Sequence, residues 1–340
     1  MAVIDAINEH LAVEHDVIVE RTAKGDFLYE MDGYRWEMGQ RPDGLLVSIE
    51  APDNNAMMLF KEEIIAHIQN LDATAAASIR WSGEMTPAGI LPPNFTPARV
   101  IRSEELFLGM QRVTLEYERP ELFDAASLHV RVLLPRDDEP RPVWPKLDGR
   151  GVPLWPEGKD ELHVRWMTIR TLRQAPCQID IDVAWHDHGR MSEWAKKARA
   201  GTTVGLMGPA GTAVLPVTTG LFLAADGTGI PTIARQLECL PEDAKGDVVA
   251  ALPESSLAAA YFGQTPLTVH DLKPLRFDRD ILWMAKDFAN PSRTQYAFFA
   301  GEVHTAKQLR HVFRSDLSLG KGKQVSTGFW RQETAPSNTC

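Results

Sequence analysis

The segment HVRWMTIR, residues 163–170, combines side chains that bind a phosphate and a flat ring. Arg165 carries a guanidinium that is always charged and holds phosphate oxygens through parallel hydrogen bonds. Met167 offers a thioether that packs well on an aromatic ring, and Thr168 offers a hydroxyl. Strand alternation puts Arg165 and Met167 on one face and Thr168 on the other, so all three meet one ligand only where the strand bends or ends. The alternative interpretation is a plain strand with a solvated arginine.

Two further segments have the residue types of anion sites. In DVAWHDHGRMSEWA, residues 182–195, a helix start offers free backbone N–H groups and a positive dipole end, with Gly189 allowing close approach and Ser192 able to donate. In DGTGIP, residues 226–231, two glycines let the backbone approach a phosphate, and the proline suits the first turn of a helix. This loop is not a full G-x-G-x-x-G and is weak evidence alone.

The apolar strand that follows this loop, in GDVVAALPES (residues 246–255), suggests how the ribose of a nucleotide would be held. Glu254 ends this strand, at the place where an acidic residue holds an unphosphorylated ribose. Ser255 and Ser256 beside it equally suit a 2′-phosphate. These residues therefore lean only slightly to an unphosphorylated ribose over a phosphorylated one.

Composition limits the class of partner. The chain has 340 residues, 44% hydrophobic and 24% charged, with a formal net charge of −10. This acidic balance argues against nucleic acid or an anionic membrane as a general partner, so an anionic ligand requires a local basic pocket.

The cysteines and the N-terminus predict the compartment. Cys177, Cys239 and Cys340 are far apart and odd in number, which gives neither a metal spacing nor a disulfide framework and suggests reducing conditions. The acidic start lacks the pattern of a signal peptide, and no stretch approaches the ~18 apolar residues of a membrane span. We expect a cytoplasmic protein without a protein-held metal.

The first part of the chain predicts a small α+β domain over residues 1–82. A short helix over 1–12, three or four alternating strands with Asp-Gly hairpin turns at 32–33 and 43–44, and a longer amphipathic helix account for it. The proline-bearing stretch 83–97 reads as a linker.

The rest of the chain predicts two more domains. Over 98–211, six alternating runs and one helical patch indicate an antiparallel β-barrel capped by a helix. Over 212–331, apolar strands alternate with helices, which predicts a Rossmann-like parallel α/β domain. We expect DILWMA (280–285) and YAFFAGEV (296–303) to be strands of this domain. The tail 332–340 is expected to be disordered.

The motifs of residues 98–331 resemble, in order, those of the siderophore-interacting protein family. The resemblance rests on LHVRVLLP, RWMTIR, IDIDVAWHDHGRMSEWAKKARAGTTVGLMGPAG, AADGTGIPTIARQLECLP, FFAGEVHTAKQLRHVFRSDLSL and STGFWR. The family consists of flavin-dependent ferric-siderophore reductases within the ferredoxin-reductase-like group. Residues 1–82 also look like an accessory domain of relatives, for which we consider recruitment of a protein partner.

The resemblance implies an FAD-binding barrel and a nicotinamide domain. Hydride passes from NADH or NADPH to FAD, and electrons pass singly to Fe³⁺ held in a siderophore, which releases Fe²⁺. This needs no protein acid or nucleophile, and the sequence has no catalytic triad or carboxylate pair. Two alternatives stay open: a flavin reductase with another acceptor, such as a quinone or partner protein, and a non-catalytic iron-chelate binding protein with a weakened flavin site.

The resemblance also implies residue roles. Arg165 holds the FAD pyrophosphate and Thr168 the ring edge, while Met167 stands where the family has tyrosine. Phe329 and Trp330 shield the ring until nicotinamide displaces them. The predicted cofactor-binding residues are Arg165, Trp166, Met167, Thr168, Asp182, His186, Gly189, Ser192, Gly227, Thr228, Gly229, Glu302, Phe329 and Trp330. Basic residues considered for the siderophore are Lys146, Arg150, Arg170, Lys273, Lys307 and Arg310.

Overall fold

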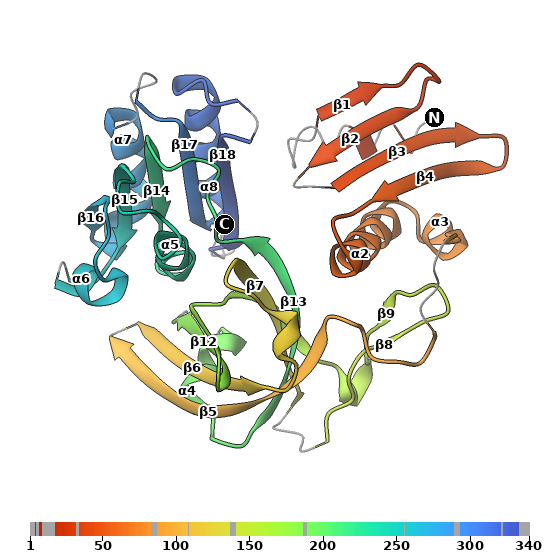
Figure 1. Ribbon diagram of the computed structural model, residues 1–340, viewed down its shortest axis with the longest axis horizontal. Coiled ribbons are helices and arrows are strands. Elements are labelled where there is room, and N and C mark those ends of the chain that lie inside the picture. The colour runs from red at the N-terminus through yellow and green to blue at the C-terminus, as the bar shows by residue number, and fades with distance from the viewer. Residues whose placement is uncertain are drawn as a thin grey trace, which may run out of the picture. The chain divides into compact units, whose positions relative to one another are not determined.

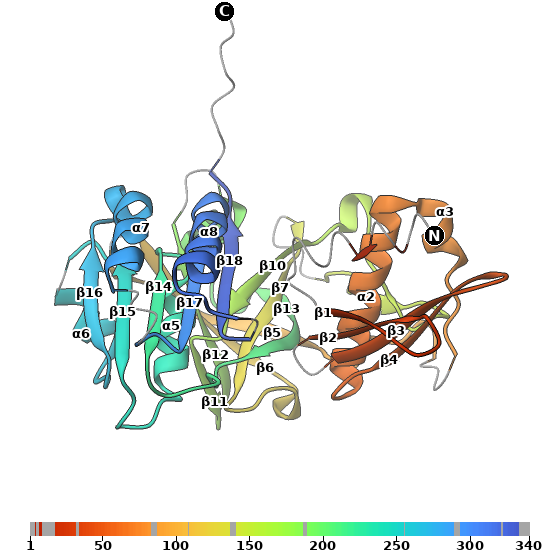
Figure 2. The same cartoon turned by 90° about the horizontal axis from the view of Figure 1, so that it is seen from above.

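A computed structural model describes most of the chain, in two compact units (Figures 1 and 2). One unit comprises residues 1–95 with 143–161, and the other residues 96–142 with 162–340. The described residues are 4, 7–8, 18–31, 34–82, 87–107, 109–136, 141–185, 189–254, 256–288, 293–320 and 322–332.

The N-terminal unit contains the predicted α+β domain. Its antiparallel sheet has the order β1 (Ile18–Arg21), β2 (Phe27–Met31), β3 (Tyr34–Arg41) and β4 (Gly44–Glu50), followed by helices α2 (Asn54–Leu71) and α3 (Ala73–Ser78). Tyr29 and Trp36 are cross-strand partners whose rings stack at 5.1 Å, and Phe60 of α2 lies 4.9 Å from the Trp36 ring. The expected helix over 1–12 and the Asp-Gly at 32–33 fall largely or wholly outside the described residues.

A later segment also belongs to this unit. It carries β8 (Lys146–Leu147), β9 (Pro153–Leu154) and a 3₁₀ turn (Gly158–Asp160). The Trp155 indole N–H donates to Glu62 of α2 at 3.1 Å, and the Leu147 backbone bonds those of Gly89 and Ile90. The chain thus leaves the barrel after its third strand, enters the N-terminal unit and returns.

The predicted antiparallel barrel is present in the second unit. Its strand order is β10-β7-β13-β5-β6-β12-β11. The barrel closes because β10 and β11, at opposite ends of this order, are joined directly through residues 169–170; the Arg170 N–H donates to the Asp180 carbonyl at 2.9 Å. The strands are β5 (Phe95–Phe107), β6 (Met110–Tyr117), β7 (Ser127–Leu134), β10 (His163–Thr168), β11 (Thr171–Gln174), β12 (Cys177–Ala184) and β13 (Thr203–Thr212), with a 3₁₀ turn at Pro120–Leu122.

The helical patch forms α4 (Arg190–Lys197), as expected. Met191 and Ala195 are buried against the barrel core, because they lie four residues apart on one face of the helix.

The predicted parallel α/β domain follows the barrel. Its sheet has the order β16-β15-β14-β17-β18, with all pairs parallel. Helices α5 and α6 cover one face of the sheet, and α7 and α8 the other (Figure 2). The elements are β14 (Leu221–Ala225), α5 (Ile230–Leu237), β15 (Gly246–Ala251), α6 (Ser256–Phe262), β16 (Thr268–Leu272), a 3₁₀ turn (Pro274–Arg276), α7 (Phe277–Phe288), β17 (Tyr296–Glu302), α8 (Val303–His311), a π-helical turn (Val312–Asp316) and β18 (Gln324–Trp330).

One predicted strand is wrong. DILWMA (280–285) lies within α7, and the strand in this part of the sheet is β16. Ile281, Met284 and Ala285 are buried, which is the three-and-four spacing of a helix face, whereas Trp283 between them is 66% exposed. The run therefore forms a helix with one buried apolar face, although its apolar composition suggested a strand.

The glycines of DGTGIP differ in what surrounds them, which yields a stability prediction. A Cβ on Gly229 would lie 2.3 Å from the Ala300 carbonyl oxygen, whereas one on Gly227 meets only Ala184 at 3.8 Å. Gly229→Ala should therefore lower the free energy of unfolding by about 1–3 kcal/mol, and Gly227→Ala should leave it near wild type. Urea unfolding of both variants checks this; equal stabilities would contradict the close packing of the loop on β17.

Candidate functional site

Among the residues that the structure describes, Arg165 of β10 and Arg190 at the start of α4 have no acidic partner. Arg165 is exposed and bonds the Val164 carbonyl of its own strand, and Arg190 is the first residue of α4. Within the described part of the chain neither forms an ion pair. Burial first, and then the charges of Arg165 and Arg190, lower the pKa of His163 to about 4, so both cations act on one place. Arg190 was missed in the sequence, although it directly follows Gly189.

The start of α4 has no side-chain cap. Gly189 is the N-cap residue, and the Ser192 hydroxyl donates backwards to the Ala184 carbonyl at 3.0 Å. Ser192 thus anchors the helix to the end of β12. The positive dipole end of α4 and the two guanidinium groups together favour an anion at this place. His186 lies outside the described residues.

The end of β10 meets the α/β domain through Thr168. This buried residue has its Oγ1 2.7 Å from Oγ1 of Thr232 on α5 and 3.5 Å from Nδ1 of His129 on β7. The Phe329 ring of β18 lies edge-on to the His129 ring, with centroids 5.9 Å apart. Thr168 and Phe329 were predicted site residues, and the structure brings both to His129, which sequence reasoning did not single out.

His129 is held neutral at this junction. Burial lowers the pKa of its imidazole to about 4, against a smaller opposite effect of a hydrogen bond with the Met167 backbone. At neutral pH it therefore contributes a ring with a donor and an acceptor, and no charge.

The remaining two residues of RWMT lie on opposite faces of β10. Met167 is half-buried and packs against the barrel core. Trp166 is 42% exposed, with the Arg131 guanidinium 4.6 Å above its ring. Contact of Met167 and Trp166 with a flavin stays a prediction.

Asp226 organises the glycine loop after β14. Its Oδ1 accepts from the Thr228 N–H at 2.8 Å and the Thr228 hydroxyl at 2.6 Å, and its Oδ2 accepts from the Trp330 indole at 2.7 Å. The loop and β18 are thus fixed to one another at the carboxyl edge of the sheet. Gly227 is half-buried, and among the described residues a Cβ there would meet only Ala184, at an ordinary contact distance of 3.8 Å.

Glu302 has a capping role in the structure. Its buried carboxylate accepts from the backbone N–H groups of His304 and Thr305 at the start of α8. Asp278 lies nearby: burial is the main cause that raises its pKa, and the charges of Asp226 and Glu302 add to it. This edge is therefore acidic, and contact of Glu302 with a cofactor stays a prediction.

Asp182, a predicted cofactor residue, joins the two domains. Its fully buried carboxylate forms two 2.7 Å bonds with Arg112 of β6 and accepts from the Tyr261 hydroxyl of α6 at 2.5 Å. Both oxygens are engaged by the protein, which gives Asp182 a structural role; a contact with the cofactor stays a prediction.

The basic residues considered for a siderophore are not one cluster. Lys146 and Arg150 belong to the N-terminal unit, where Arg150 pairs with Asp148. Lys273 follows β16 and Arg310 bonds Ser326 of β18, which are opposite edges of one sheet. Arg170 is buried and bonds Glu238 and the Tyr261 carbonyl, and Lys307 is exposed on α8.

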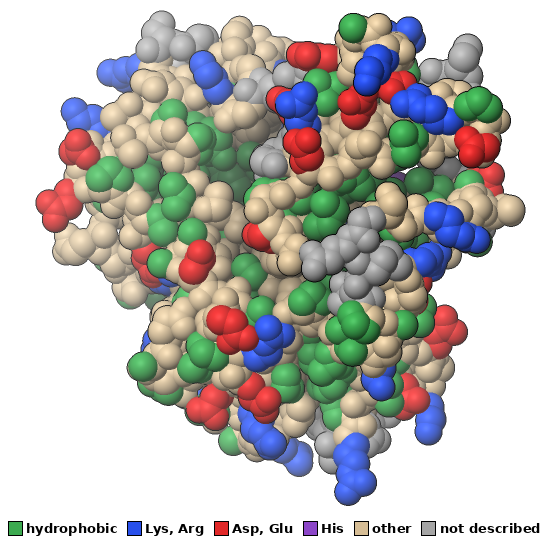
Figure 3. Space-filling model, turned by 45° about the vertical axis from the view of Figure 1, so that its right-hand side comes forward, with side chains coloured by type: hydrophobic (Ala, Val, Ile, Leu, Met, Phe, Trp, Pro, Cys, Tyr) green, Lys and Arg blue, Asp and Glu red, His purple; other side chains and the backbone are tan. Residues whose placement is uncertain are grey.

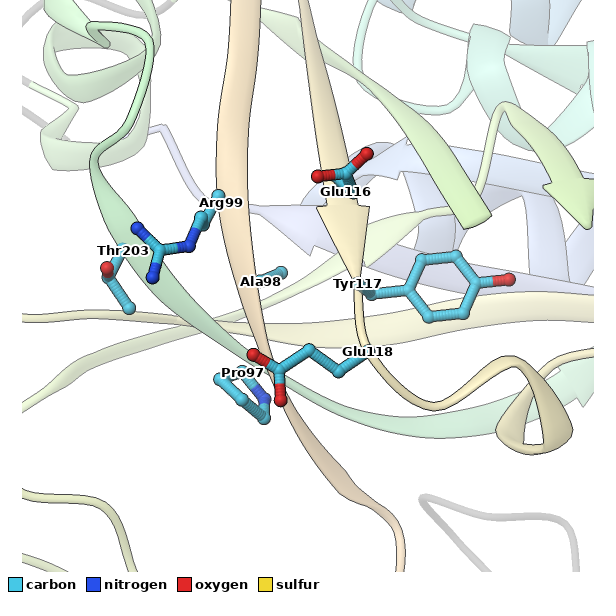
Figure 4. A pocket seen from close by; sticks show the side chains of 7 residues that line it. All are labelled: Pro97, Ala98, Arg99, Glu116, Tyr117, Glu118 and Thr203. Atoms are coloured by element: carbon cyan, nitrogen blue, oxygen red, sulfur yellow. The ribbon is translucent and has the colours of Figure 1, made fainter. Parts of the chain in front are cut away.

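The surface shows two further features. On the face drawn in Figure 3, charges of both signs are interspersed among the coloured residues, without a broad basic field. A cavity of about 200 Å³ lies on the barrel (Figure 4), but none of the predicted site residues lines it. It is lined by Pro97, Ala98, Arg99, Glu116, Tyr117, Glu118 and Thr203.

Among the helices of the described ranges, none is long and apolar enough to cross a membrane.

A barrel followed by a parallel α/β domain is also the fold of a solved ferredoxin reductase, which is 14% identical with a TM-score of 0.50. Residues 99–213 match the siderophore-interacting FAD-binding domain, and residues 218–333 match the siderophore-interacting protein domain. The chain belongs to the siderophore-interacting protein family.

Named relatives and solved structures agree with this assignment. Ferric vibriobactin reductase ViuB of Vibrio cholerae is 25% identical over 257 residues, covering 68% of this chain and 88% of the relative. The NADPH-dependent ferric-chelate reductase of Escherichia coli is 30% identical over 162 residues, covering 46% and 62%. The siderophore-interacting protein structure from Acinetobacter baumannii has a TM-score of 0.59 at 21% identity, covering 72% of this chain and 93% of that one.

The two arginines yield a binding prediction. Arg190→Ala should weaken FAD affinity about 10- to 100-fold, because a charge-assisted contact contributes roughly 1.5–3 kcal/mol. Arg165→Ala should have a similar effect. Fluorescence titration with FAD measures it, and Arg279→Ala, which removes a surface partner of Asp280, is the control. Wild-type affinity in both site variants would contradict the anion site.

His129 yields a pH prediction. Its pKa in the folded state, about 4, is below the ordinary value of 6.5, so the unfolded chain binds the extra proton first. The buried neutral imidazole of His129 contributes fully to the free energy of unfolding above about pH 6.5. That free energy falls by roughly 1–3 kcal/mol as the pH drops towards 4. Urea unfolding at several pH values should show a smaller acid loss for His129→Gln, whereas His311→Gln, at an exposed position, should follow wild type. Identical profiles for all three proteins would contradict the enclosed, neutral imidazole.

Proposed function

We propose that the chain is an FAD-dependent ferric-siderophore reductase that uses a nicotinamide dinucleotide. The observation that carries this is the meeting of Thr168, His129 and Phe329 where the barrel joins the α/β domain. FAD, when bound, accepts hydride from the nicotinamide and passes single electrons to Fe³⁺. The relatives named as ferric-chelate reductases support the same reaction.

The residues present suit FAD. Arg165, Arg190 and the positive dipole end of α4 offer charge to its diphosphate. Thr168 offers a buried hydroxyl to the ring edge, and the neutral His129 and the Phe329 ring enclose this end. These side chains bind and orient, and none of them needs to act as an acid or a nucleophile.

The dinucleotide is proposed to lie at the glycine loop and the start of α5. Gly227 leaves the backbone approachable there, and Asp226 fixes the loop. Beyond the loop, Glu254 is exposed at the end of β15, and the Lys273 ammonium donates to the Pro253 carbonyl at 3.0 Å. A cation beside this turn favours a 2′-phosphate, so we propose that NADPH is accepted as well as NADH.

The acceptor is proposed to be a ferric siderophore, with iron as substrate and not as a resident metal. Among the described residues there is no group of three His, Cys, Asp or Glu side chains that could hold a metal. Cys177 and Cys239 are free thiols, and we propose a cytoplasmic protein.

A comparison of acceptors tests this function. The FAD-loaded protein with NADPH should reduce ferric siderophores with a higher kcat/KM than quinones, with Fe²⁺ followed by a coloured ferrous chelator. Faster quinone reduction would replace the proposal with another flavin reductase. Binding of ferric siderophore by a protein that never holds FAD would replace it with a non-catalytic binding protein.

A further inference from the structure

We propose that Thr232 is a positioning residue of the flavin site, which sets the direction of the Thr168 hydroxyl proton and thereby the flavin reduction potential. This rests on the proposed function, because it concerns the hydroxyl that we place at the flavin ring edge.

The two hydroxyl groups form one buried pair between two domains. Thr232 lies on α5 with no exposed surface, Thr168 ends β10 with 5% exposed, and their oxygens are 2.7 Å apart. Either oxygen can be the donor, so nothing in the pair itself fixes the direction of the hydrogen bond. A buried hydroxyl needs a partner, and each supplies the other's.

A ligand at Thr168 decides that direction. A hydroxyl has one proton and two lone pairs. When the ring-edge nitrogen is an acceptor, Thr168 donates to it, and Thr232 then donates to Thr168. When that nitrogen carries a hydrogen, Thr168 accepts from it and must direct its own proton to Thr232. The Thr232 hydroxyl then turns its proton to a carbonyl of the preceding turn, as helical threonines do. No covalent bond changes within the pair, since both hydroxyl groups only rotate.

The two redox states depend on Thr232 to different extents. Without the Thr232 hydroxyl, Thr168 can still donate to an oxidised ring. On a reduced ring its proton needs another acceptor, and His129 Nδ1 at 3.5 Å is at the limit of hydrogen-bond distance. Loss of Thr232 should therefore disfavour the reduced state, because an unsatisfied buried donor is costly.

The position of Thr232 also joins the two cofactor regions. Thr232 lies in the first turn of α5, which starts at the glycine loop proposed for the dinucleotide. The ring-edge hydroxyl is thus tied to the helix on which the hydride donor is proposed to lie, and Thr232 touches neither cofactor in this account.

The test is the midpoint potential of bound FAD, measured against reference dyes, with FAD affinity from fluorescence. Thr232→Val keeps the shape of the side chain and removes the hydroxyl. At a fixed applied potential it should lower the ratio of reduced to oxidised FAD about tenfold, which corresponds to a midpoint potential about 30 mV more negative for a two-electron couple. Thr232→Ser should restore the wild-type potential. Thr114→Val is the control. It removes a buried hydroxyl that donates to the Asp180 carboxylate elsewhere in the barrel, and it should leave the midpoint potential unchanged.

Several results would overturn the inference. A wild-type potential in a folded, FAD-binding Thr232→Val protein would leave Thr232 as a packing residue, and so would equal shifts in the serine and valine variants. Thr232→Ala provides the same comparison if valine prevents folding. A wild-type protein that binds no FAD would overturn the proposed function itself, whereas an active reductase with unshifted variants would overturn this inference alone.

Discussion

The buried carboxylate of Asp182 is the interaction on which the site depends. It lies in the barrel, and its partners are Arg112 of the same barrel and Tyr261 of the α/β domain. Removing one partner of such a buried charge costs about 3–5 kcal/mol, because the remaining charge is left without compensation. Burial above all, and the Asp182 charge, raise the pKa of Tyr261 well above its ordinary value, so its hydroxyl stays a donor.

Arg170 strengthens the same junction. Its guanidinium lies over the Tyr261 ring at 5.2 Å and bonds the Tyr261 carbonyl and Glu238, while Arg235 reaches the Ala125 carbonyl at 2.7 Å. These contacts fix α5 and α6 against the barrel. The contacts of Thr168 with Thr232 and of His129 with Phe329 also span this junction.

The sequence was sufficient for the architecture and for part of the site. Runs of alternating apolar and polar residues predicted the barrel, and apolar strands between helical patterns predicted the α/β domain. Both patterns can be read from the spacing of apolar residues within a short window of sequence. DILWMA was misread because a six-residue apolar run does not distinguish a strand from a buried helix face. Thr168 and Phe329 were singled out through motifs, whereas Thr232, Asp226 and Arg190 were not. Their importance arises from contacts between segments far apart in the sequence, such as Thr168 with Thr232, which no local pattern encodes.

The central claim is that electrons travel from a nicotinamide through FAD to chelated iron. An anaerobic absorption experiment on the FAD-loaded protein tests it most directly, with NADPH added first and ferric siderophore second. The account predicts flavin bands that bleach with NADPH and return with the siderophore in step with Fe²⁺ formation. Bands that bleach but do not return with ferric siderophore would contradict it.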